Sequence, residues 1–183
     1  PLASYQETPA HQDFSDCVDI LSRAYSPLPV QGVLKRQAED FIVDEELGFS
    51  LSGEGEHHYL FIEKCNLNTV EVAEKIAAYV GIQQRDVSYS GMKDKIALTR
   101  QWFSVQLPGL SLDAPDWEGL ERLDWRGGRL LVKEKSLHHR KLRRGAHKAN
   151  FFRLKLRDIK NLSVDGTLQM LETTIHQRAV KVS

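Results

Sequence analysis

One segment of the chain, residues 68–81, carries a complete signature of an amphipathic helix. Asn68 is a favoured N-cap residue, Glu71 stands three positions after it, and Gly81 provides a stop. The apolar positions between them recur at helical spacing, at Val72, Ala73, Ile76 and Val80. The fold must therefore contain another element against which this apolar stripe is buried.

The rest of the chain is dominated by the two-residue period of β-strands. We expect strands over residues 58–64, 86–90, 97–107, 129–135 and 149–157, a short hairpin or bent strand over 32–47, and helical segments near 16–24 and 164–178. In the last strand the expected inward side chains are Phe152, Leu154 and Leu156, and the outward ones are Arg153, Lys155 and Arg157. The predicted fold class is α+β: a mixed, mainly antiparallel sheet with helices on one face.

The first thirty residues have little periodicity and contain Pro9, Pro27 and Pro29, which predicts an N-terminal arm over 1–30 ahead of a domain over 31–183. The sequence shows no secretory signal, and no apolar run approaches the roughly 20 residues of a membrane helix. The two cysteines, Cys17 and Cys65, lack metal-ligand spacing. We therefore expect a reduced, cytoplasmic protein with no membrane contact.

Charge is distributed unevenly along a chain whose formal net charge is zero. Residues 1–60 contain eleven acidic and three basic residues, a balance of −8, whereas residues 135–157 contain nine Lys or Arg residues, three histidines and no acid. Charge runs are usually solvated faces, but a run without compensating acids favours a polyanionic partner. The sequence therefore indicates a nucleic-acid contact in this second half.

Asp94 is the residue best placed for chemistry, on a loop expected between two strands. Gly91 permits a tight turn, and Lys93 and Lys95 flank the carboxylate with positive charges, which favour its ionised form. An ionised aspartate can act as a nucleophile or a base. An aspartate in a Lys-Asp-Lys turn is far more often a solvated turn residue, so the motif alone is a weak indication of catalysis.

Three separate blocks resemble the TruD family of tRNA pseudouridine synthases, in the family's order. They are Gly91-Met-Lys-Asp94 with Ala97, Thr99 and Gln101-Trp102; the stretch Lys35 to Glu45 with Gly53 to His57; and the basic stretch His139 to Phe152. The resemblance covers roughly residues 30–180. It implies a tRNA substrate, by family uridine 13, and a reaction that breaks the C1′–N1 bond, rotates the uracil and rejoins it through C5 without a cofactor.

The resemblance also implies roles for individual residues. Asp94 would be the catalytic carboxylate, acting either on the sugar or base as a nucleophile or on the C2′ proton; these two routes stay open. Both need the uridine flipped into a pocket. The implied substrate-binding residues are Phe41, Asn150, Phe152, Lys35 and Lys93, and the implied RNA phosphate contacts are Arg140, Lys141, Arg143, Arg144 and Lys148. From their patterns alone, Phe41 and Phe152 also fit a core and Asn150 a turn cap.

Members of the family are about twice as long as these 183 residues. The resemblance therefore implies that residues 31–183 are the N-terminal half of the catalytic domain, without the C-terminal half and the inserted domain. An isolated half would have an open sheet edge and little or no activity. No protein partner is evident, and we expect a monomer.

Two other functions compete with this interpretation. The first is a non-catalytic protein that binds structured RNA through residues 135–157. The second is a metal-dependent nuclease that uses Asp94 with Glu54 or Glu56. The histidine pairs at 57–58 and 138–139 do not predict a shared metal ion, because adjacent residues in a strand point to opposite faces. We therefore expect no metal site.

Overall fold

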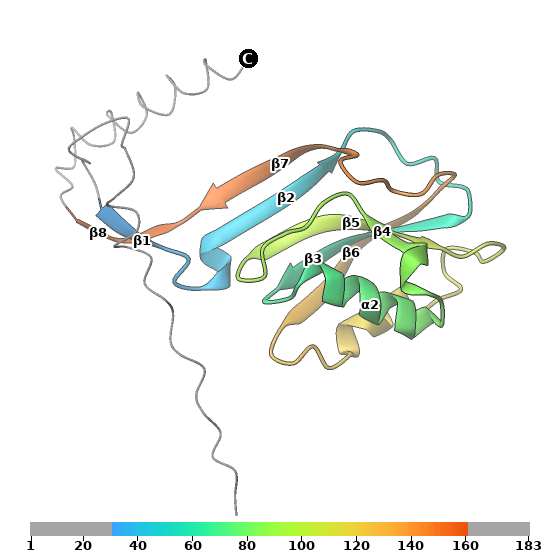
Figure 1. Cartoon of the computed structure of the whole chain (residues 1–183), viewed down its shortest axis with the longest axis horizontal. Helices are drawn as coiled ribbons and strands as arrows, with labels where there is room; N and C mark the ends of the chain where they lie inside the picture. The colour runs from blue at the N-terminus through green and yellow to red at the C-terminus, as the bar shows by residue number, and fades with distance from the viewer. Residues whose placement is uncertain (1–30, 161–183) are drawn as a thin grey trace, which may run out of the picture. The chain divides into compact units, whose positions relative to one another are not determined.

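The structure is a computed structural model that describes residues 31–160 (Figure 1). The helical segments expected near 16–24 and 164–178 lie outside the described residues. In chain order the elements are β1 (Gln31–Leu34), η1 (Ala38–Asp40), β2 (Phe41–Leu47), β3 (His57–Cys65), α2 (Thr69–Val80), η2 (Gln84–Asp86), β4 (Val87–Tyr89), β5 (Leu98–Gln106), η3 (Trp117–Arg122), β6 (Arg129–His138), β7 (His147–Leu154) and β8 (Leu156–Lys160).

Six of the strands form one sheet with the order β6-β3-β5-β2-β7, and β4 pairs with β5 beside this path. The β2–β5 pair is parallel and the other pairs of this sheet are antiparallel. Strands β1 and β8 form a separate two-stranded sheet. The predicted α+β class with a mixed, mainly antiparallel sheet is therefore confirmed.

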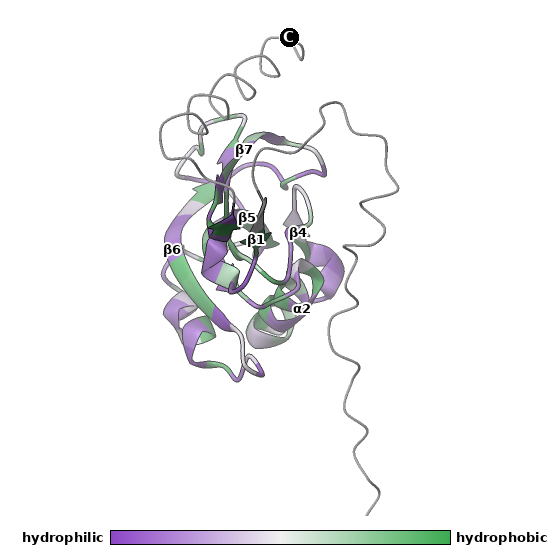
Figure 2. Ribbon diagram, turned by 90° about the vertical axis from the view of Figure 1, so that its left-hand side faces the viewer, coloured by the Kyte–Doolittle hydropathy of each residue, from purple (hydrophilic) through white to green (hydrophobic). Residues whose placement is uncertain are grey.

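Helix α2 begins and ends where its caps predict. The Asn68 side chain accepts a hydrogen bond from the Val70 N–H, and Gly81 adopts a left-handed φ of 73°. Its buried stripe packs on one face of the sheet together with η3, and the core there includes Leu60, Ile62, Phe103, Val105 and Trp117. Figure 1 shows both helical segments on the same side of the sheet, and Figure 2 shows green and purple along α2. Burial of each large apolar side chain contributes roughly 1.5–3 kcal/mol.

Two expectations for the strands are wrong. Residues 32–47 form neither a hairpin nor one bent strand: η1 separates β1 from β2, β1 pairs with β8, and β2 lies between β5 and β7. Residues 149–157 are divided between β7 and β8 and do not bury an apolar face: Phe152, Leu154 and Leu156 are 62%, 53% and 46% exposed. The reason is position in the sheet. Strand β7 is an edge strand, and the main core lies under the half formed by β3, β5 and β6.

Candidate active site

Asp94 lies in the loop that connects β4 to β5, as predicted. Its carboxylate is about half exposed and accepts a hydrogen bond from Lys35 Nζ at 2.7 Å. Lys93 does not provide this charge, although it is adjacent in sequence, because its ammonium is turned to another carboxylate, that of Glu45. The cation that contacts Asp94 therefore comes from a residue 59 positions earlier in the chain.

Lys35 joins the carboxylate to an aromatic ring. Its backbone adopts a φ of 56°, a left-handed conformation that costs a non-glycine residue roughly 1–3 kcal/mol. From there its ammonium lies 4.0 Å from the centroid of the Phe41 ring as well as on Asp94. A ligand that stacks on Phe41 would thus also meet the Lys35–Asp94 pair.

Phe41 and Phe152 form an aromatic pair where β2 begins and β7 ends. Their ring centroids are 6.0 Å apart and their planes differ by 27°. The strand register explains the contact, since Phe41 lies opposite Leu154 and Val43 opposite Phe152, which places both rings on the same face. Because Phe152 is mostly exposed, this pair presents an aromatic surface that Lys35 connects to Asp94.

Two polar atoms on the same face have no hydrogen-bond partner among the described residues. They are Asn150 Oδ1 and Thr99 Oγ1, and both atoms are buried. Asn150 of β7 lies opposite Glu45 of β2, and Thr99 of β5 lies beside Val43 of β2. A buried acceptor without a partner costs free energy, so these atoms are available to a polar ligand.

Buried polar groups hold the Asp94 loop in place from one side. Glu45 on β2 accepts hydrogen bonds from Lys93 Nζ at 2.6 Å, Ser90 Oγ at 2.8 Å and the Trp102 N–H at 3.1 Å. The side chains of Glu45 and Lys93 are 0% and 6% exposed, so this is a buried ion pair. Lys93 therefore fixes the loop that carries Asp94.

A second set of buried groups holds the same loop from β3, α2 and β5. Gln101 Nε2 donates to the carbonyl of Gly91 at 3.0 Å, while Thr69 Oγ1 donates to Gln101 and accepts from the Lys93 N–H. Lys64 Nζ donates to the carbonyl oxygen of Asp94 at 3.1 Å. The sequence patterns predicted no role for Thr69, Gln101 or Lys64. The position of Lys64 in a strand expected to be covered on both sides could have indicated a buried, hydrogen-bonded ammonium, because lysine is seldom buried without a partner.

Lys64 is fully buried, and burial is the main cause that lowers the pKa of its ammonium to about 8 from its usual 10.5; the nearby Lys93 charge lowers it further. Between these two values the unfolded chain holds a proton that the folded chain has lost, so stability rises with pH there. Between pH 8 and 10.5, we expect the free energy of unfolding of the native protein to rise by about 3 kcal/mol relative to that of Lys64→Met. Urea unfolding across this range measures the difference, and identical pH slopes would contradict it.

The predicted phosphate contacts lie on the connection from β6 to β7 and at the start of β7. Arg140, Lys141, Arg143, Arg144 and Lys148 are all exposed. Some already have internal partners: Arg144 lies 4.6 Å from the Tyr89 ring centroid, and Lys148 Nζ lies 2.8 Å from Glu46. This basic connection is joined to the Asp94 loop, because the Gly145 N–H donates to the Ser90 carbonyl at 2.7 Å.

The two carboxylates of the nuclease interpretation have different partners. Asp94 binds Lys35, whereas Glu54 lies 3.4 Å from His139 Nε2. Within residues 31–160 no three His, Cys, Asp or Glu side chains gather in a geometry that would hold a metal ion. Of the helices in this range, none is long and apolar enough to cross a membrane.

The fold is similar to that of a Methanosarcina mazei protein whose crystal structure is described as a tRNA pseudouridine synthase D (TruD), with a TM-score of 0.67 and 22% identity over 90% of this chain and 36% of that one. At this identity the likeness defines the class of fold alone.

Sequence similarity identifies the family. The family model for tRNA pseudouridine synthase D (TruD) matches residues 18–181, so the chain belongs to the TruD family. The match begins before residue 30, earlier than the sequence blocks predicted. Similar relatives include the tRNA pseudouridine synthases D of Pseudomonas syringae pv. syringae (strain B728a), 46% identical over 85% of this chain, and Stutzerimonas stutzeri (strain A1501), 48% identical over 75%. The chain spans only 42% and 38% of these two relatives.

Proposed function

We propose that the protein containing this chain is an isomerase that converts uridine in tRNA, at position 13, to pseudouridine, with Asp94 as the catalytic carboxylate. One observation carries the proposal: in a chain of the TruD family, Asp94 forms an ion pair with Lys35, whose ammonium also contacts the Phe41 ring of a partly exposed aromatic pair. We further propose a cytoplasmic monomer that uses neither a metal ion nor a cofactor.

The proposed reaction balances without a co-reactant. The bond from C1′ to N1 of the uracil breaks, a bond from C1′ to C5 forms, C5 loses its proton and N1 gains one. Asp94 either attacks as a nucleophile or removes the C2′ proton, and both roles need its carboxylate close to the glycosidic bond. The substantial exposure of this carboxylate supports such access.

In this proposal the flipped uracil stacks on Phe41, with Phe152 closing the pocket and Lys35 between base and carboxylate. Stacking of a base on an aromatic side chain is worth about 1–3 kcal/mol. Asn150 Oδ1, a buried atom without a hydrogen-bond partner in residues 31–160, supports a polar contact to the base or sugar. Arg140, Lys141, Arg143, Arg144 and Lys148 would hold phosphates, which position an RNA without reading its sequence.

We propose that residues 31–183 form one half of a catalytic domain and that the other half covers the aromatic face of β7. The exposure of Phe152 and Leu154 and the greater length of the relatives support this. The 183 residues alone should then show little or no turnover.

The experiment that tests the function uses the whole protein, an unmodified tRNA transcript and excess EDTA. We expect pseudouridine to form in an intact RNA chain, since no step of the proposed reaction uses a metal. Digestion and mass spectrometry measure the product, and denaturing gels measure chain length. Cleavage that requires a divalent ion would favour the nuclease, and tight tRNA retention without pseudouridine would favour a binding protein without catalysis.

A further inference from the structure

A hollow lies on the face of the sheet that carries Tyr59. Its volume is about 640 Å³, within the range of roughly 300–1,000 Å³ typical of ligand pockets. The lining residues that matter here are Phe49, Tyr59, His138, Arg140, Lys141 and Arg143. Neither Asp94 nor the residues around it, Lys35, Phe41 and Asn150, line this hollow.

The hollow has an aromatic wall that is already assembled. The Phe49 and His138 rings stack with centroids 5.1 Å apart and planes that differ by 23°. Tyr59 packs edge-on against both rings, at 6.2 Å from Phe49 and 5.4 Å from His138. Tyr59 is fully buried while Phe49 is 37% exposed, so the buried ring supports an exposed one.

The position of His138 is fixed by the loop after β2. The Ser52 N–H donates to His138 Nδ1 at 3.2 Å, and the Gly53 N–H donates to the Leu137 carbonyl at 3.1 Å. Gly55 has a φ of 123°, and a Cβ on it would lie 2.4 Å from the His138 carbonyl group, so only glycine permits this approach. Burial lowers the pKa of His138. The imidazole is therefore a fixed ring, and Phe49 stacks on one face of it.

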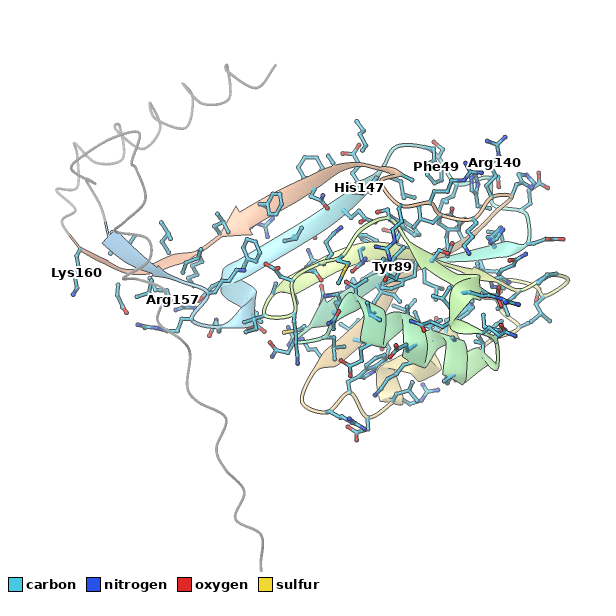
Figure 3. The ribbon with its side chains drawn as sticks, in the orientation of Figure 1. Phe49, Tyr89, Arg140, His147, Arg157 and Lys160 are labelled. Carbon is cyan, nitrogen blue, oxygen red and sulfur yellow. The ribbon has the colours of Figure 1, made fainter. Side chains whose placement is uncertain are left out.

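Another part of the wall is cationic, and Arg140 lies near Phe49 at the same end of the molecule (Figure 3). Arg140 and Arg143 are exposed, and no acidic residue lines the hollow. The buried Tyr59 hydroxyl donates to the Arg140 carbonyl at 2.9 Å, and burial raises the pKa of this phenol to about 12, so it remains a donor. This hydrogen bond fixes the backbone from which the Arg140 guanidinium extends.

We propose that this hollow binds one unpaired nucleotide of the tRNA outside the reaction pocket, with the base on Phe49 and the phosphate on Arg140 and Arg143. An exposed aromatic ring in the same hollow as two guanidinium groups matches a base linked to a phosphate, whereas a free phosphate would need no aromatic wall. The inference rests on the proposed tRNA substrate. It adds a contact that holds the RNA while a different uridine occupies the Asp94 site.

The test compares Phe49→Leu, Phe49→Ala and Phe49→Tyr in the whole protein, with Leu110→Ala as an exposed control outside the hollow. Fluorescence anisotropy of labelled, unmodified tRNA gives the Kd. We expect Phe49→Leu and Phe49→Ala to weaken binding roughly 5- to 150-fold, with no change in the slope of log Kd against log salt, because stacking releases no counterions. Phe49→Tyr and Leu110→Ala should bind as the native protein does.

Arg143→Gln provides the complementary measurement. It should reduce the salt slope by about 0.7–0.9, the change expected for one phosphate contact. Native affinity in Phe49→Leu would overturn the proposal, even if Phe49→Ala failed to fold, and an unchanged slope in Arg143→Gln would overturn the phosphate assignment. If the native protein itself failed to bind tRNA, the proposed function would fail before any Phe49 variant was compared.

Discussion

Replacing Asp94 by asparagine is expected to lower the single-turnover rate of uridine isomerisation by roughly 10²–10⁴-fold or more, with a nearly unchanged Kd for tRNA. Asparagine keeps the shape of the side chain, and its amide oxygen can still accept the hydrogen bond from Lys35. It cannot attack as a carboxylate or remove a proton. Rapid-quench sampling at saturating protein measures the rate, and anisotropy measures the Kd.

Asp113→Asn is the matched control for this substitution. Asp113 is also a loop aspartate bound to a lysine, with its Oδ1 3.0 Å from Lys135 Nζ, and its side chain is 81% exposed. It lies outside the candidate site, so its removal should leave the rate unchanged. A normal rate in Asp94→Asn would show that the catalytic assignment is wrong.

Removing the buried carboxylate of Glu45 is expected to have the largest effect on stability. Glu45→Ala leaves the ammonium of Lys93 buried without a partner and removes the acceptor of Ser90 Oγ and of the Trp102 N–H. Breaking one side of a buried ion pair costs about 3–5 kcal/mol. We expect a loss of this size in the free energy of unfolding, measured by urea, together with a lower isomerisation rate because the Asp94 loop is released.

The adjacent residue gives the control for the Glu45 prediction. Glu46 on the same strand pairs with Lys148 at the surface, where both side chains are substantially exposed. Such pairs contribute about 0–1 kcal/mol, so Glu46→Ala should change stability little. The double variant Glu45→Leu, Lys93→Met should regain stability because no unpaired charge remains buried. Its isomerisation rate should nevertheless remain low. A loss below about 1 kcal/mol in Glu45→Ala would contradict the supporting role of this pair.

The sequence predicts the elements of this fold because each has a local signal. The caps at Asn68 and Gly81 and the alternation in β3 and β5 depend on neighbouring residues, and these features are confirmed. Alternation separates two faces of a strand without showing which face is covered. Phe152 was therefore expected inside, and it is exposed because β7 is an edge strand.

The contacts within the candidate site depend on strand order, which local patterns do not contain. The contact of Lys35 with Asp94 exists because η1 and β2 bring Lys35 to the start of β5. In the same way, the segment 135–157, which contains no acidic residue, acquires acidic partners from other parts of the fold. Arg157 forms two hydrogen bonds to the buried Asp40, and this contact is the main cause that holds the pKa of Asp40 below its usual value. Counting charges along the chain therefore overestimates the cations free to meet RNA.

The claim that Asp94 belongs to a uridine-isomerising site is tested most directly in cells that lack the gene and carry either the native gene or Asp94→Asn at equal protein levels. Base-resolution mapping of pseudouridine in their tRNA is the measurement. We predict pseudouridine at position 13 with the native gene and unmodified uridine there with Asp94→Asn. Pseudouridine at position 13 with both genes, or with neither, would contradict the claim.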